Sequence, residues 1–167
     1  MKKHTISVLV QNKFGVLARV AGLFSGRGYN IESLSVNSTN SPDISRMTIV
    51  TSGDDNIIEQ IDKQLNKLID VIKVTDLSGR GFIERELILV KVAVDKKTRS
   101  DVIQLTEIFK GKIVNVQKNE LTIELSGDGL KIENFLDMLK EYSIIELVKT
   151  GRAAISRQPG PTENYMD

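Results

Sequence analysis

The feature that most constrains the fold of this chain is a change of hydrophobic period that occurs twice in the same order. An alternating run is followed by a helical stripe, two further alternating runs, a second helical stripe and a last alternating run. This order is typical of the ferredoxin-like split βαβ arrangement, in which two helices cover one face of an antiparallel sheet. In the first half, we expect strands at 5–10, 31–37, 46–51 and 71–77, and helices that begin at Gly15 and after Asp54 or Asp55.

The second half repeats the order after a polar, glycine-containing segment. We expect strands at 87–94, 112–116, 120–125 and 144–148, and helices at 100–109 and 130–141. The sequence therefore predicts an α+β protein with two ferredoxin-like βαββαβ domains in tandem. The expected boundaries are 1–77 for the first domain, 78–86 for a linker, 87–157 for the second domain and 158–167 for a disordered tail rich in polar residues, Pro and Gly.

The first expected strand carries apolar residues on both faces. Ile6, Val8 and Val10 share one face, whereas Leu9 lies on the other. Because successive side chains of a strand point to opposite faces, this pattern indicates a sheet that is partly covered on both sides.

Composition excludes several classes of function. The chain has 23 basic and 22 acidic residues and a net charge of +1, so it lacks the positive field that favours nucleic acid or an anionic membrane. It has no cysteine, which excludes disulfides and thiolate metal sites. No apolar run approaches the roughly 18 residues of a membrane span. We therefore expect a cytoplasmic protein that binds neither nucleic acid nor membrane.

Candidates for catalysis or metal binding are absent from the pattern. The single histidine, His4, lies near the terminus, where we expect it to be solvated and inert. The pair Asp54–Asp55 suits the start of a helix, and Ser25–Gly28 suits the turn after one. We expect no catalytic residue and no metal site.

The turn before the first helix has the features of a site for a small ligand. Gly15 leaves the backbone N–H groups of the helix start open to an anion such as a carboxylate. Asn12 and Asn30 offer amide oxygens that can accept from an ammonium group. The apolar residues that could form walls are Phe14, Val16, Leu17 and Ile31. Together these groups fit an apolar amino acid, although the same residues could serve only to make a tight turn.

The stretch GVLARVAGLFSGRGYNIESL resembles the signature of an ACT domain, and in particular that of the small regulatory subunits of acetolactate (acetohydroxyacid) synthase. The resemblance continues through SRMTIVTSGDD, QIDKQLNKLIDVIKV, ERELILVKV and TEIFKGKIVNV to TGRAAISR, and covers residues 4–157 in order.

The resemblance implies a subunit that performs no chemistry. A large catalytic subunit of the family uses thiamine diphosphate, Mg²⁺ and FAD, so this chain is expected to hold no cofactor. The small subunit raises the activity of that partner and confers feedback inhibition by a branched-chain amino acid, usually valine, with leucine or isoleucine as alternatives. ERELILVKV and TGRAAISR are candidates for activation, or else solvated strand edges.

The resemblance also implies where the effector binds. The family's N-terminal ACT domains form a homodimer edge to edge, and the effector lies at the interface. The effector loop corresponds to Asn12, Gly15, Val16 and Leu17, and the second-strand contacts correspond to Asn30 and Ile31 of the other protomer. Position 14 is Phe, which is bulkier than the residue expected in many members.

Three other functions share parts of this pattern. RNA-recognition motifs have the same element order, but they require stacked aromatics that the first and third strands lack. An acylphosphatase-like enzyme would require an arginine in the first strand–helix loop, which carries Lys13 while Arg19 lies one turn into the helix. An ACT-domain amino-acid sensor that serves another enzyme is the remaining alternative.

Overall fold

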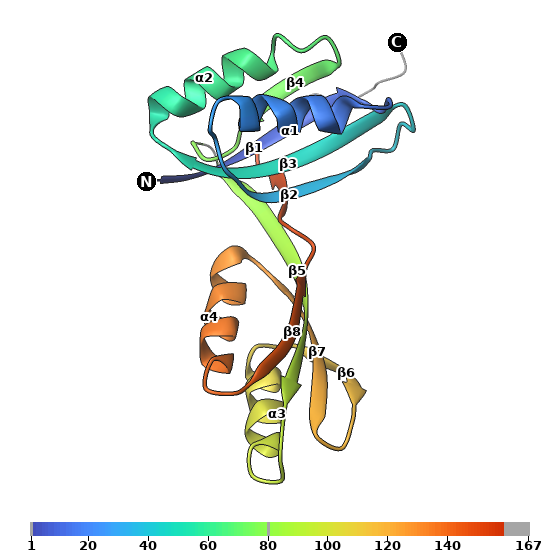
Figure 1. Cartoon of the computed structure of the whole chain (residues 1–167), viewed down its shortest axis with the longest axis vertical. Coiled ribbons are helices and arrows are strands. Elements are labelled where there is room, and N and C mark those ends of the chain that lie inside the picture. The colour runs from blue at the N-terminus through green and yellow to red at the C-terminus, as the bar shows by residue number, and fades with distance from the viewer. Residues whose placement is uncertain (1, 80, 159–167) are drawn as a thin grey trace. The chain divides into compact units, whose positions relative to one another are not determined.

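The computed structural model describes residues 2–79 and 81–158 and divides into two compact units (Figure 1). Unit 1 holds the chain up to Ile83 together with the segment from Arg152, and unit 2 holds Glu84–Gly151. Each unit has an antiparallel sheet and two helices in βαββαβ order, which confirms the predicted fold class. Within the described range, none of the helices has the length and apolar character needed to cross a membrane.

Unit 1 contains one more strand than the sequence pattern indicates. Its elements are β1 (Lys2–Gln11), α1 (Val16–Gly26), β2 (Ile31–Ser38), β3 (Ile44–Gly53), α2 (Asp55–Leu65), β4 (Val71–Asp76) and β9 (Ala153–Ser156). The sheet order is β2-β3-β1-β4, so β2 and β4 are its edge strands. Figure 1 shows α1 and α2 beside each other over one face of this sheet.

The core of unit 1 lies between the sheet and the two helices. It joins alternate residues of β1 and β3 with one stripe of each helix: Ile6, Val8, Val10, Met47, Ile49, Val16, Val20, Phe24, Ile58, Ile61 and Leu65. Full burial of each large side chain stabilises the fold by about 1.5–3 kcal/mol. The core therefore fixes α1, and with it the turn that precedes α1.

The opposite face of this sheet is also covered. Leu9 and Val50 on that face are only 3% and 2% exposed. Strand β9 lies here, since the Ala154 N–H donates to Thr48 Oγ1 at 3.4 Å and the Arg152 N–H donates to Ser33 Oγ at 3.0 Å. The two-sided coverage predicted from Leu9 is thus confirmed, and residues grouped with the second domain in the sequence analysis supply part of it.

The expectation that His4 is solvated was wrong. His4 is 2% exposed, and its Nδ1 lies 3.3 Å from Asp76 Oδ2. The reason is strand pairing, because β1 continues to Lys2 and lies between β3 and β4. Nearness to the chain terminus did not indicate exposure for a residue on a central strand.

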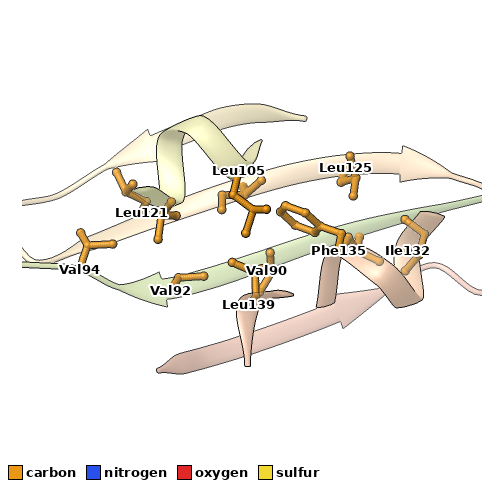
Figure 2. Close-up of a cluster of buried hydrophobic side chains, with 12 residues drawn as sticks. Val90, Val92, Val94, Leu105, Leu121, Leu125, Ile132, Phe135 and Leu139 are labelled. Carbon is orange, nitrogen blue, oxygen red and sulfur yellow. The ribbon is translucent and has the colours of Figure 1, made fainter. Parts of the chain in front are cut away.

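Unit 2 repeats the element order of unit 1. Its elements are β5 (Phe82–Ala93, whose first two residues lie in unit 1), α3 (Arg99–Ile108), β6 (Lys112–Val116), β7 (Glu120–Gly127), α4 (Gly129–Leu139) and β8 (Ile144–Lys149). The strand order is β6-β7-β5-β8. Figure 2 shows Leu105 of α3 and Phe135 of α4 pointing toward Val90 on β5.

Strand β5 starts at Phe82 and so includes residues that the sequence analysis assigned to a linker. The segment ERELILVKV lies on β5, which is paired on both sides from Ile88 and is therefore not a solvated edge. Arg80 of the predicted linker and residues 159–167 of the predicted tail lie outside the described residues.

Candidate functional site

The turn between β1 and α1 ends in a glycine whose backbone conformation is easily adopted only by a residue without a side chain. Gly15 is the N-cap of α1, with φ at 82°, in the left-handed region. No side chain caps this helix start, and its first turn carries no acidic residue. By contrast, Asp54 caps α2 and Asp128 caps α4, through bonds from the N–H groups of Ile57 and Lys131.

The uncapped start of α1 is chemically suited to an anion. Backbone N–H groups of a first helical turn have no intrahelical acceptor, and the helix dipole places partial positive charge there. The bare Cα of Gly15 allows a carboxylate to approach these groups closely. The local geometry therefore agrees with the kind of ligand that the sequence indicates.

Asn12 is held in one orientation by the neighbouring turn. Its backbone N–H donates to the Asp43 carbonyl at 2.7 Å, and its side-chain Nδ2 donates to the Pro42 carbonyl at 2.8 Å. With Nδ2 committed to Pro42, the amide oxygen is the group that Asn12 can offer to a ligand donor.

A cation beside Gly15 was not part of the predicted site. The Arg19 guanidinium lies next to Gly15, at 3.4 Å from the position that a Cβ on residue 15 would take. Asp70 holds it there through a 2.7 Å contact between Arg19 Nη2 and Asp70 Oδ2. The spacing from 15 to 19 was a usable signal, because residues four apart share a helix face. The partner Asp70 comes from the loop before β4 and had no local signal.

The predicted apolar wall residues differ in their exposure. Phe14 is fully exposed and Leu17 is 42% exposed, so both offer apolar surface around the turn. Val16 is 3% exposed and packs in the core of unit 1. Its side chain therefore anchors the start of α1 and does not face a ligand.

The other two predicted residues lie at the opposite end of the sheet. Ile31 pairs with Thr51, and Thr51 pairs with His4 near the start of β1, whereas Asn12 follows the end of β1. At about 3.3 Å per residue, the strand separates the two ends by roughly 23 Å. Within one chain, the structure therefore does not bring Asn30 and Ile31 to the turn before α1.

This second end carries a carboxylate. Glu32 follows Ile31, and a hydrogen bond from the Ser52 hydroxyl lowers its pKa below the ordinary value, with a further contribution from Lys3. Lys3 Nζ lies 3.5 Å from Glu32 Oε2. Asn30 itself is exposed, and its backbone carbonyl accepts from Thr51 Oγ1 at 2.7 Å. The Asn30 side chain is thus placed at an accessible sheet corner.

Among residues 2–79 and 81–158, no three or more His, Cys, Asp or Glu side chains cluster in a way that could hold a metal ion.

Comparisons with known proteins cover both units. Residues 6–73 match a family model described as an AHAS small subunit-like ACT domain, and residues 85–158 match one described as the small subunit of acetolactate synthase. A probable acetolactate synthase small subunit of Methanothermobacter thermautotrophicus is 54% identical over 155 residues, 92% of each chain. The acetolactate synthase small subunit of Aquifex aeolicus is 48% identical, over 95% of this chain and 83% of its own length. The crystal structure of the Thermotoga maritima small subunit superposes with a TM-score of 0.85 at 40% identity, and the match covers 96% of this chain and all of the other.

Proposed function

The chain belongs to the family of acetolactate synthase small subunits, and on this basis we propose that it activates a separate catalytic subunit and makes that subunit sensitive to feedback inhibition. In this proposal the chain itself performs no chemistry, and thiamine diphosphate, Mg²⁺ and FAD are held by the catalytic subunit. The effector is a branched-chain amino acid, with valine first and leucine or isoleucine as alternatives. It is sensed by the ACT domain in unit 1.

The proposed binding unit is a homodimer that pairs along β2. An exposed edge strand presents unpaired N–H and C=O groups and tends to be paired or protected. Antiparallel pairing of two β2 strands around a two-fold axis places Ile31 of the partner subunit opposite the end of β2 at Ser38. Ser38 pairs with Ser45, which pairs with Val10 near the end of β1. The dimer would therefore bring together the two groups of residues that one chain keeps apart.

Each group of the effector then has a partner of matching chemistry. Its carboxylate binds at the start of α1 beside Gly15. Its ammonium group donates to the amide oxygens of Asn12 and of Asn30 of the partner subunit. Its aliphatic side chain contacts Phe14, Leu17 and Ile31 of the partner subunit.

The observation that carries this proposal is the uncapped, left-handed Gly15 beside an Asn12 amide that is fixed by Pro42. A ligand that completes the helix start favours the arrangement of chains in which both halves of the site meet. Such a ligand can inhibit only if it binds one arrangement of the complex better than another. The N–H groups and dipole at the start of α1 provide that difference.

The test compares Gly15→Asp with Gly15→Asn. Both residues tolerate the left-handed conformation better than other side chains and have similar size, so they differ mainly in charge. The isolated protein is titrated by calorimetry with valine, leucine and isoleucine, and the reconstituted holoenzyme is assayed for inhibition. We expect the Asp variant to weaken effector binding by roughly a hundredfold, because its carboxylate competes with that of the ligand.

The Asn variant should retain clearly more binding than the Asp variant. Equal valine sensitivity in the wild type and in the Asp variant would contradict the proposed site. Absence of binding for all three amino acids in the wild type would contradict the sensing role.

A further inference from the structure

Helix α1 has an exposed face that differs from an ordinary solvated helix surface. Its exposed positions after Leu17 are occupied by Ala18, Arg19, Gly22, Ser25 and Gly26. The exposed positions of α2 carry charged and amide side chains instead: Asp55, Asn56, Glu59, Gln60 and Lys63. Charged faces of the second kind are usual where a helix meets water.

The glycines of this face are not required by packing within the chain. A Cβ placed on Gly22 or on Gly26 would meet no atom within 4 Å. Glycine is the poorest helix former after proline, so a mid-helix glycine such as Gly22 weakens α1. Gly22 and Gly26 are not among the described glycines that have a positive φ, so backbone conformation does not require glycine at either position. Close approach of another chain is the remaining physical use of a bare backbone here.

These glycines form one wall of a groove between α1 and the C-terminal end of α2. The groove has a volume of about 630 Å³, and Leu23 and Leu68 contribute its apolar surface. Its charged lining consists of Arg19, Arg27 and Lys67, and none of the described residues that line it is acidic. The groove therefore has one wall of small residues, and all of the charged residues that line it are positive.

Two of these cations have no counter-charge within the described part of the chain. Arg19 is paired with Asp70, but Arg27 and Lys67 form no ion pair with any described residue. Arg27 belongs to the Ser25–Gly28 turn, which the proposed effector site does not use. Unpaired cations that flank a groove complement a partner of opposite charge.

We propose that the α1–α2 groove is a docking surface for an acidic segment of the catalytic subunit. An Asp- or Glu-bearing segment lies against the bare backbone at Gly22 and Gly26, and its carboxylates pair with Arg27 and Lys67. This inference rests on the proposed function, because it identifies the surface through which the regulatory chain holds its catalytic partner.

The first test reverses the charge of the groove in the full chain. Arg27→Glu and Lys67→Glu, singly and together, are compared with Lys63→Glu, which makes the same change on α2 outside the groove. Association with the purified catalytic subunit is measured by biolayer interferometry at two salt concentrations. We expect about a tenfold rise in Kd for each single variant, roughly a hundredfold for the double variant, and a weaker salt dependence. Lys63→Glu should change Kd less than threefold.

The second test fills the groove without changing charge. Gly22→Ala and Gly22→Leu both improve helix propensity, so both should raise the thermal unfolding temperature. Only Leu places a large side chain in the groove, and we expect only Leu to weaken association, by about tenfold. This pair separates a docking defect from a folding defect.

The outcomes also separate this inference from the proposed function. Valine binding by the isolated variants should equal that of the wild type, because Arg27 and Lys67 lie outside the effector site. If the double variant bound the catalytic subunit with the same Kd as the wild type, the proposed docking surface would be overturned and the regulatory role would stand. Binding of inorganic phosphate in the groove, with unchanged affinity for the catalytic subunit, would also overturn it and assign the groove to a small anion.

Discussion

Several single residues of this protein act through partners far along the chain. Arg19 is held by Asp70, and His4 contacts Asp76 across the sheet. Each pair joins a residue near the start of unit 1 to the region of β4. The Arg19–Asp70 pair ties the first turns of α1 to the loop before β4, whereas the His4–Asp76 pair lies near the opposite end of β1. Only the first pair therefore supports the turn of the proposed effector site, which a ligand site needs to keep its geometry.

The hydrogen bonds of the Asp95 carboxylate should make the stability of the protein depend on pH. Its carboxylate accepts from the N–H groups of Thr98 and Lys97 at the start of α3, and these bonds lower the pKa of Asp95 below its ordinary value. A lowered pKa in the folded state means that the stabilisation is complete above the ordinary pKa of about 3.9. It is lost as the pH falls through the lower, folded-state pKa.

We therefore expect Asp95→Asn to lower the thermal unfolding temperature at pH 7. The gap between wild type and variant should close as the pH is lowered below about 4. Scanning calorimetry between pH 2.5 and pH 7 provides the measurement. Asp137→Asn, which breaks an exposed pair with Lys140, is the control and should have little effect at any pH. A gap that stays constant over this range would contradict the role of the charge.

Strand β9 is the element of unit 1 that the apolar period does not indicate. This strand covers the sheet face opposite the helices, and Ala154 on it is 7% exposed. Its neighbour Ala153 is exposed. The two positions therefore differ in burial although they are adjacent and chemically identical.

We expect Ala154→Glu to destabilise unit 1 by roughly 2–4 kcal/mol, because it buries a charge without a partner. Ala153→Glu should stay within about 0.5 kcal/mol of the wild type. Urea unfolding followed by circular dichroism measures both changes. Equal effects at the two positions would show that β9 does not cover the sheet in solution.

The period of the apolar residues predicted eight strands and four helices, and all of them occur. Their ends were less predictable: β1 begins at Lys2 because pairing with Gly53 extends the strand through polar residues. Strand β9 was missed because its four residues are too few to show a period. The open helix start at Gly15 was predictable because its signal is local. The pairing of Arg19 with Asp70 was not, since a pattern shows which residues are polar and not which ones meet.

At the scale of the whole molecule, the proposed effector site exists only when two chains pair. Val36 lies on edge strand β2 and is 37% exposed. Antiparallel pairing around a two-fold axis near the middle of β2 would bring the two copies of Val36 close together. A charge at this position should therefore oppose self-association.

We expect Val36→Lys to remain folded, to sediment as a monomer, and to lose effector binding at concentrations where the wild type is a dimer. Sedimentation velocity and valine titration of the same samples provide the measurement. Val116→Lys, on exposed edge strand β6 of unit 2, is the matched control and should keep both properties. A monomeric variant that binds valine as tightly as the wild type would place the whole site within one chain.

The discontinuity of unit 1 has a consequence for synthesis on the ribosome. Strand β9 follows all of unit 2 in the chain, so the complete sequence of unit 2 is translated before the last strand of unit 1 exists. Domains generally fold as units while the chain emerges. Here the first unit to begin would be the last to finish, and a nascent chain would expose the uncovered face around Leu9 and Val50 until translation reaches β9. A chain truncated before β9 would keep this apolar sheet surface exposed, and chaperones and proteases act on such chains.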